Sequence, residues 1–195
     1  MTTRSSTRVA TRGVLYVHSA PSALCPHIEW AAGGVLGRAV NLVWTGQGAQ
    51  AGTYRAEYSW SGESGTAAAI ASALRGWGQL RFEVTEEPTA SGQGGTEGAR
   101  FSYTPHLGIF HAVTGIHGDI MIPEDRLKAA VLQASHADFS TGDPSHGDLP
   151  DDDRVVGVSL LSEIDKLLGK PWDDELEPFR HAGDGAPVRW LHQVV

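Results

Sequence analysis

Cysteine is almost absent from this 195-residue sequence, in which Cys25 is the only one. A single thiol excludes an intramolecular disulfide and any zinc site built from several thiolates. Long apolar runs are missing too: none approaches the about 20 residues that span a bilayer, and the N-terminus lacks the apolar run of a secretory signal. We therefore expect a cytoplasmic protein in a reducing compartment, with no membrane partner.

Positive charge is also scarce, since 23 acidic and 15 basic side chains give a formal net charge of -8. The basic residues cluster only within residues 1–12, a stretch that we interpret as a disordered tail. A nucleic-acid backbone would be repelled by the rest of the chain, so no nucleic-acid partner is expected. The hydrophobic fraction of 41% is that of an ordinary globular protein and is sufficient for a buried core.

The strongest local pattern is a nearly continuous apolar run over residues 13–20, followed by helical spacing over residues 23–36. The run is typical of a central strand that is covered on both faces. Pro26 suits the first turn of the predicted helix, and Gly37 suits its C-terminal stop. Gly33 and Gly34 lie late in this helix, which indicates close approach to a neighbouring backbone.

Three more strands and one more helix follow within residues 13–88. The strands are predicted at residues 40–45, 53–60 and 79–85, and the helix opens at residues 63–66. This βαββαβ order predicts a ferredoxin-like half whose first strand is central. Its polar sheet face is expected to be solvated or salt-bridged, and it carries Arg55, Glu57, Arg81 and Glu83.

A Gly-rich loop at residues 89–98 separates this half from residues 99–195, which we predict to be an α+β extension packed on it. The fold class is therefore α+β, with an additional β-hairpin, two helices and a C-terminal strand. We expect a mobile insertion at about residues 137–158, rich in Asp, Gly, Ser and Pro. The other predicted elements are a hairpin at 100–103 and 108–113, a short strand at 120–122, helices at 123–135 and 160–168, and a strand at 188–195.

Several long strings are familiar, among them GVLYVHSAPSALCPHIEWA, LGIFHAVTGIHGDIMIPEDRL and LLGKPWDDELEPFRHAGDGAPVRWLHQVV. Through these strings the chain resembles a family of conserved actinobacterial proteins that are classed as a domain of unknown function. The resemblance extends from Gly13 to Val195. It implies a compact, cytoplasmic bacterial protein, but no activity, cofactor or functional residue comes with it.

The first candidate site is His111, His117 and Asp119 in FHAVTGIHGD. Two imidazoles and a carboxylate form a suitable ligand set for a divalent metal, or an acid–base pair, if the three side chains converge. The alternative is a tight structural turn at Gly115 and Gly118, capped by Asp119.

The second candidate site is His18, Cys25 and His27, which flank the first strand-to-helix connection. A thiol at a helix N-terminus beside a histidine can act as a nucleophile, whereas a lone cysteine is more commonly a buried core residue.

The third candidate is the acidic segment with Trp172, Asp173, Asp174, Glu175 and Phe179. We expect a turn or short helical piece that Pro178 ends. Aromatic side chains beside charges suit a protein-docking surface, while the alternatives are acid–base carboxylates or an aromatic anchor to the core. Glu177, Arg180 and His181 complete the charged block.

No motif in the sequence requires a reaction or a cofactor. The leading hypothesis is a non-enzymatic binding or regulatory domain that recognises a protein or a small molecule. The alternative is a metal-dependent or His/Asp acid–base enzyme centred on His111, His117 and Asp119. The oligomeric state is not predicted.

Overall fold

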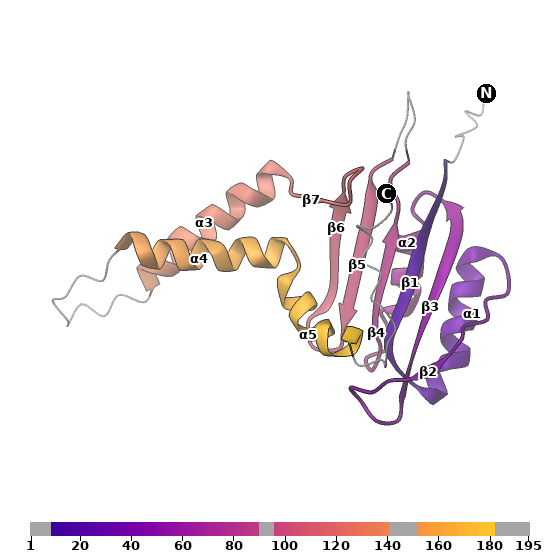
Figure 1. The fold of residues 1–195 in the computed structure, drawn as a ribbon. Helices are drawn as coiled ribbons and strands as arrows, with labels where there is room; N and C mark the ends of the chain where they lie inside the picture. Colours follow the sequence, from indigo (N-terminus) through magenta and orange to yellow (C-terminus); the bar gives the residue numbers. More distant parts are fainter. Residues whose placement is uncertain (1–8, 90–95, 141–151, 182–195) are drawn as a thin grey trace, which may run out of the picture.

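The computed structural model describes residues 9–89, 96–140 and 152–181, and these form an α+β fold (Figure 1). One antiparallel sheet holds all the strands of this part of the chain, in the order β2-β3-β1-β4-β5-β6-β7. The α+β class predicted from the sequence is confirmed. No helix within the described ranges is both long and apolar enough to cross a membrane.

Strand β1 (Ala10–Pro21) lies between β3 (Thr53–Glu63) and β4 (Arg81–Glu86), as its continuous apolarity predicts. Leu15 and Ala20 are fully buried and Val17 is nearly so. The predicted tail is too long at its C-terminal end, because residues 10–12 already pair with β3. Backbone hydrogen bonds to β3 hold residues 10–12 in the strand, and the polar side chains of this stretch did not predict them.

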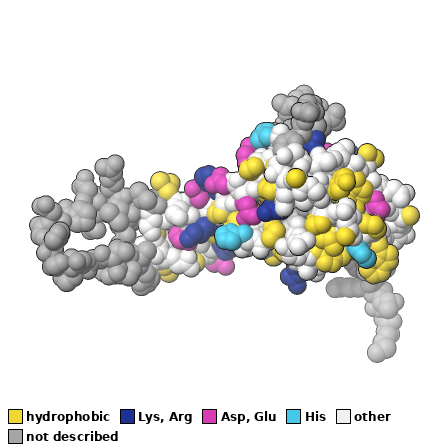
Figure 2. Space-filling view, turned by 90° about the horizontal axis from the view of Figure 1, so that it is seen from below, with side chains coloured by type: hydrophobic (Ala, Val, Ile, Leu, Met, Phe, Trp, Pro, Cys, Tyr) yellow, Lys and Arg dark blue, Asp and Glu magenta, His cyan; other side chains and the backbone are white. Residues whose placement is uncertain are grey.

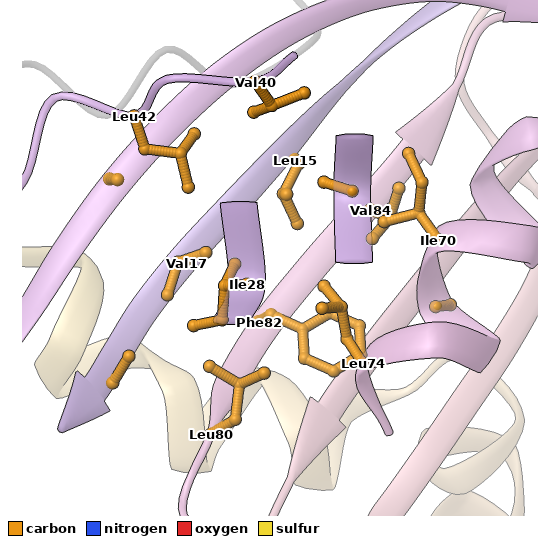
Figure 3. Close-up of a cluster of buried hydrophobic side chains, with 14 of the residues drawn as sticks. Leu15, Val17, Ile28, Val40, Leu42, Ile70, Leu74, Leu80, Phe82 and Val84 are labelled. Atoms are coloured by element: carbon orange, nitrogen blue, oxygen red, sulfur yellow. The ribbon is translucent and has the colours of Figure 1, made fainter. Parts of the chain in front are cut away.

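Helices α1 (Cys25–Leu36) and α2 (Thr66–Leu74) cover one face of the sheet and form the main core with it (Figure 3). A short 3-10 helix, Ser22–Leu24, precedes α1, and Gly37 ends α1 in the left-handed conformation. The core joins Leu15 and Val17 of β1 to Ile28 of α1, Ile70 of α2 and Phe82 of β4. Burial of such side chains stabilises by about 1.5–3 kcal/mol each.

The N-terminus of α2 receives a side chain from outside the helix. The Glu86 carboxylate accepts hydrogen bonds from the backbone N–H groups of Gly65 at 2.8 Å and Ala67 at 2.9 Å. A carboxylate here satisfies free helical donors and complements the helix dipole. Glu86 is only 5% exposed and is therefore a structural acid.

The strand predicted at residues 40–45 is wrong in extent, since β2 comprises only Thr45–Gly46. Val40 and Leu42 are buried, but they precede the strand. The backbone N–H of Leu42 donates to the Glu29 side chain of α1 at 2.8 Å, so a helix carboxylate replaces a strand partner. In the sheet order β2-β3-β1-β4, strand β1 is central, as the predicted βαββαβ arrangement requires. The ferredoxin-like description itself stays a prediction.

Beyond the Gly-rich loop, β5 (Gly98–Thr104) pairs directly with β4 and continues the same sheet. The hairpin of β5 with β6 (Gly108–Thr114) is confirmed, and β7 (Ile120–Met121) forms the edge. A single sheet therefore spans both predicted halves.

Helices α3 (Glu124–Ser140) and α4 (Asp152–Leu167) pack on each other and leave the sheet as an arm (Figure 1). Both helices extend into the insertion predicted at 137–158, so its ends are helical. The arm presents exposed apolar side chains among charged ones of both signs (Figure 2). Among its described side chains the exposed large apolar ones are Leu127, Val131, Leu132 and Leu161, and the exposed Leu168 directly follows α4.

Helix α5 (Lys170–His181) follows a bend at Gly169, whose φ is 80°, and contacts β1 and β5. Of the predicted turn or short helical piece, the helical alternative is the one found, but its predicted end at Pro178 is wrong, because Pro178 lies inside this helix. The last turn is held from outside: the Phe179 carbonyl accepts a hydrogen bond from Gln47 at 3.0 Å, and Arg180 bonds to Glu83. These contacts offset the hydrogen bond that proline removes. The C-terminal strand predicted at 188–195 lies outside the described residues.

Candidate functional site

The predicted metal ligands do not form a cluster. His111 lies on β6 with its ring stacked on Phe101, at 4.5 Å between ring centroids, while His117 and Asp119 lie in the turn before β7. All three are exposed. Within the described ranges no group of three or more His, Cys, Asp or Glu side chains is placed to hold a metal ion. The turn itself is closed by backbone bonds between Gly115 and both Gly118 and Asp119.

The second predicted set is divided between different surroundings. Cys25 opens α1 on the core side, where its thiol donates to the Pro21 carbonyl at 3.7 Å. His27 is exposed on the same helix. His18 instead pairs with Glu83, with Nε2 2.7 Å from Oε2. Among the described residues, neither His18 nor His27 is therefore bonded to the Cys25 thiol as a base.

Cys25 is expected to react slowly with thiol reagents. Burial raises the pKa of its thiol, and the negative charge of Glu29 raises it further. Since only the thiolate attacks, the folded protein should react with a disulfide reagent at pH 7 more slowly than a free model thiol, and denaturant should abolish the difference. A rate in the folded protein above that of the model thiol would restore the nucleophile hypothesis.

Most of the predicted docking residues on α5 hold the helix to the sheet. Trp172 donates from Nε1 to the Gly108 carbonyl at 3.0 Å and packs on Phe110, 5.0 Å between ring centroids. Glu175 accepts from the Thr104 hydroxyl at 2.8 Å. The Phe179 ring lies 4.4 Å from the Arg81 guanidinium carbon. These contacts favour the anchoring interpretation of the segment.

The remaining two acids of α5 differ from each other. Asp174 is exposed and, among the described residues, pairs only with Lys170 of its own helix, at 2.8 Å. Asp173 accepts from Arg180 at 2.6 Å and also from Arg100. Asp173 thus belongs to a larger charged group between α5 and the sheet.

This group, the Glu83 cluster, consists of His18, Glu83, Arg100, Asp173 and Arg180. Arg100 and Arg180 each donate to Glu83 Oε1 at 2.8 Å, and Arg180 also donates from Nε to Oε2 at 3.1 Å. Ser102 adds a hydroxyl donor to Oε1 at 3.1 Å. Glu83 and Arg180 are each 7% exposed. Two carboxylates and two guanidiniums thus compensate each other in a site from which α5 excludes most water.

Burial alone would raise the pKa of Glu83, but the hydrogen bond from His18 and the positive charges of His18, Arg100 and Arg180 hold that pKa well below its usual range. The guanidinium pKa of Arg180 is raised, since the effect of Glu83 and Asp173 exceeds that of burial. Every acceptor atom of Glu83 is occupied, so the cluster joins α5 to the sheet. Sequence reasoning placed Glu83 on a solvated or salt-bridged face, and the salt-bridged alternative is the one found.

A pocket of about 550 Å³ opens where the arm meets the sheet. We call it the arm pocket. It has an aromatic wall from Phe110 and Trp172, and charged or polar groups from α3 and α4. Its lining residues are Ile109, Phe110, His111, Arg126, Ala129, Ala130, Gln133, Glu163, Lys166, Leu167 and Trp172.

Two predicted site residues, Trp172 and His111, therefore line a cavity, and His111 does so without its predicted companions. Partial burial and the positive charge of Arg126 lower its pKa. Neutral imidazole is thus favoured at neutral pH, and it can accept a proton or a hydrogen bond. Sequence reasoning singled out Trp172 only as a docking or anchoring residue and missed Arg126 and Phe110, because these residues meet only through the packing of β6, α3 and α5.

A family model describing a protein of unknown function (DUF3145) matches residues 14–143 and 152–193. The chain belongs to this family. Comparison with curated proteins and with solved structures gave no match.

The family match includes the whole Glu83 cluster and every residue that lines the arm pocket. Residues 144–151, which the match leaves out, fall within the predicted insertion. The family description assigns no activity, so function has to be argued from the geometry of the pocket.

Proposed function

We propose that this family member is a non-enzymatic binding module that recognises a small molecule in the arm pocket. The observation that carries the proposal is the combination of an aromatic wall, Phe110 and Trp172, with charged groups in one concave site. Ligand pockets commonly combine an apolar lining with a few polar groups that orient the ligand, and their volumes start at about 300 Å³. We further propose a cytoplasmic location in an actinobacterium, in keeping with the family resemblance and the single thiol.

The Glu83 cluster and Cys25 are better explained by structural roles. The Glu83 cluster has its charges compensated beneath α5, and Cys25 has a raised pKa in the core. The arm pocket differs, because its polar groups border open space. Its position between the sheet and the arm also lets a ligand influence how the arm sits on the sheet.

Filling the arm pocket tests this proposal. Ala129 is exposed on α3 and lines the pocket, so Ala129→Trp should occupy the pocket without burying a polar group. Neutral, cationic and anionic aromatic fragments would be screened by ligand-observed NMR. We expect hits for the native protein and at least a tenfold loss of affinity in Ala129→Trp.

Lys128→Trp is the matched control, since Lys128 lies next to Ala129 on the same exposed helix but outside the pocket lining. It should bind the same fragments as the native protein. Equal binding by Ala129→Trp and the native protein would show that the pocket is not the binding site.

The second candidate function is an acid–base enzyme that uses His111. The lowered pKa of His111 and its place in the arm pocket favour it, because a neutral imidazole at a cavity can act as a general base. The metal-dependent form of this candidate requires His117 and Asp119 to move toward His111. Turnover of a pocket ligand that His111→Gln abolishes without loss of ligand binding would establish the enzyme over the binding module.

A further inference from the structure

We infer that the ligand of the arm pocket is an anion, specifically a carboxylate attached to a flat apolar body, and that Arg126 is the residue that binds the carboxylate. This inference rests on the proposed function and adds the chemical class of the ligand. It follows from the charges in the pocket, the aromatic wall and the geometry of guanidinium groups.

The positive charge of Arg126 is uncompensated among the described residues. The pocket lining contains one acid, Glu163, and its Oε1 lies 2.6 Å from Lys166 Nζ, so those two charges cancel. No ion pair or hydrogen bond joins Arg126 to any other part of the chain that the structure describes. A guanidinium at a cavity that has no acidic partner among the described residues attracts an anion locally.

The electrostatic effect of Arg126 reaches the opposite wall of the pocket. After partial burial, Arg126 is the second cause of the lowered pKa of His111. The guanidinium on α3 and the imidazole on β6 therefore border the same space and repel each other when both are charged. A carboxylate between them would accept hydrogen bonds from the guanidinium and relieve this repulsion.

The aromatic wall determines the shape of the remainder of the ligand. The rings of Phe110 and Trp172 lie 5.0 Å apart at 34°, and the bond from Trp172 Nε1 to the Gly108 carbonyl fixes the indole. The indole N–H is thus already used, and the wall offers apolar ring surface. Such a surface favours a planar ring, while the planar fork of Arg126 suits the two oxygens of a carboxylate.

Three probes separate charge from shape: benzoate has both ring and carboxylate, benzamide has the ring without the charge, and acetate has the charge without the ring. Binding would be followed by NMR through the indole N–H of Trp172 and the ring protons of His111. We expect benzoate to bind at least tenfold more tightly than benzamide or acetate. Arg126→Gln should weaken benzoate about tenfold and leave benzamide unchanged.

Lys128→Gln is the matched control for Arg126→Gln, because it removes a cation from the same helix outside the pocket lining. It should leave benzoate affinity unchanged at constant ionic strength. A loss equal to that of Arg126→Gln would assign the effect to general charge and overturn the inference.

The titration of His111 gives a readout that is independent of affinity. Arg126 lowers the pKa of His111, so Arg126→Gln should raise that pKa in the free protein. Saturating benzoate should also raise the pKa in the native protein, and benzamide should not. An unchanged His111 titration with benzoate bound would overturn the placement of the carboxylate beside Arg126.

The remaining outcomes separate this inference from the proposed function. If neutral aromatic fragments bind in the pocket as well as benzoate does, the ligand class is wrong while the binding module stands. If neither charged nor neutral fragments perturb Trp172 or His111, both proposals fail.

Discussion

Glu83→Gln should lower the free energy of unfolding by about 3 kcal/mol, because removing one partner of a buried ion pair leaves the other charges uncompensated. Glu83 accepts hydrogen bonds from the guanidiniums of Arg100 and Arg180 at 2.8 Å and lies 2.7 Å from the imidazole of His18, and its own side chain is only 10% exposed. The glutamine amide keeps the shape of the Glu83 side chain but removes its charge. Asp173 is then the one acid of the Glu83 cluster that remains to pair with Arg100 and Arg180. Chemical denaturation at pH 7 measures the loss, and faster amide exchange in α5 would locate it.

Glu57→Gln is the matched control. Glu57 and Glu83 are paired with the same residue of β1, Tyr16, from opposite sides, and Glu57 is exposed. The same change of charge should shift stability there by no more than about 0.5 kcal/mol. Similar losses in both variants would show that the Glu83 cluster does not hold α5 to the sheet.

The stability contributed by Glu83 should also depend on pH in a defined direction. The pKa of Glu83 is depressed in the folded protein, against an ordinary glutamate pKa of about 4.3 in the unfolded chain. Above that ordinary pKa the contribution is complete, and it is lost as the pH falls through the depressed folded value. The native protein should therefore lose more stability than Glu83→Gln on acidification below about pH 4.3, as measured by denaturation at several pH values.

Gly13→Ala should destabilise the fold by about 3 kcal/mol, at the upper end of the usual cost of overpacking. A Cβ at this position would lie 1.8 Å from the Thr85 carbonyl oxygen and 2.4 Å from Cζ2 of Trp60. The first of these atoms is backbone in the neighbouring strand β4, and Trp60 is only 2% exposed, so neither can move freely. Thermal denaturation would detect the loss.

Gly34→Ala is the contrasting variant, since a Cβ there meets nothing within 4 Å and the residue lies inside α1. Alanine has the higher helix propensity, so this change should stabilise by about 1 kcal/mol. Destabilisation by Gly34→Ala, or a neutral Gly13→Ala, would contradict the packing described here. The prediction of a close backbone neighbour holds for Gly33, where a Cβ would lie 2.9 Å from the Arg38 carbonyl oxygen, and not for Gly34.

Elements with strong periodicity were predictable from the sequence. The continuous apolar run of β1 indicated its central position, and Gly37 marked the end of α1. Elements whose ends depend on distant partners were not. Residues 40–44 do not form the predicted strand, because the backbone N–H of Leu42 donates to the Glu29 carboxylate instead of to a strand partner. Helix α5 continues through Pro178 because Gln47 and Glu83 hold its last turn.

The candidate sites show the same division. Sequence spacing singled out His111, but it could not show that Arg126 and Trp172 border the same cavity. The sequence identified Asp173 as part of a charged segment. It could not show that Asp173 pairs with both Arg100 and Arg180, because these two arginines lie far apart in the chain and meet only where α5 packs on the sheet. The period-two pattern of β4 placed Glu83 on the polar face of the sheet, but such a pattern cannot predict that α5 covers that face.

The sequence by itself therefore determined the α+β class, the core of β1 with α1 and α2, and membership in a family of unknown function. These three features follow from local periodicity and composition, which can be recognised in residues that are neighbours in the sequence. Only the tertiary structure decided that the sheet is continuous, that Glu83 is a buried anchor for α5, and that a pocket forms where the arm meets the sheet. Those features depend on contacts between residues far apart in the chain, and their free energy arises only when packing removes the groups from water.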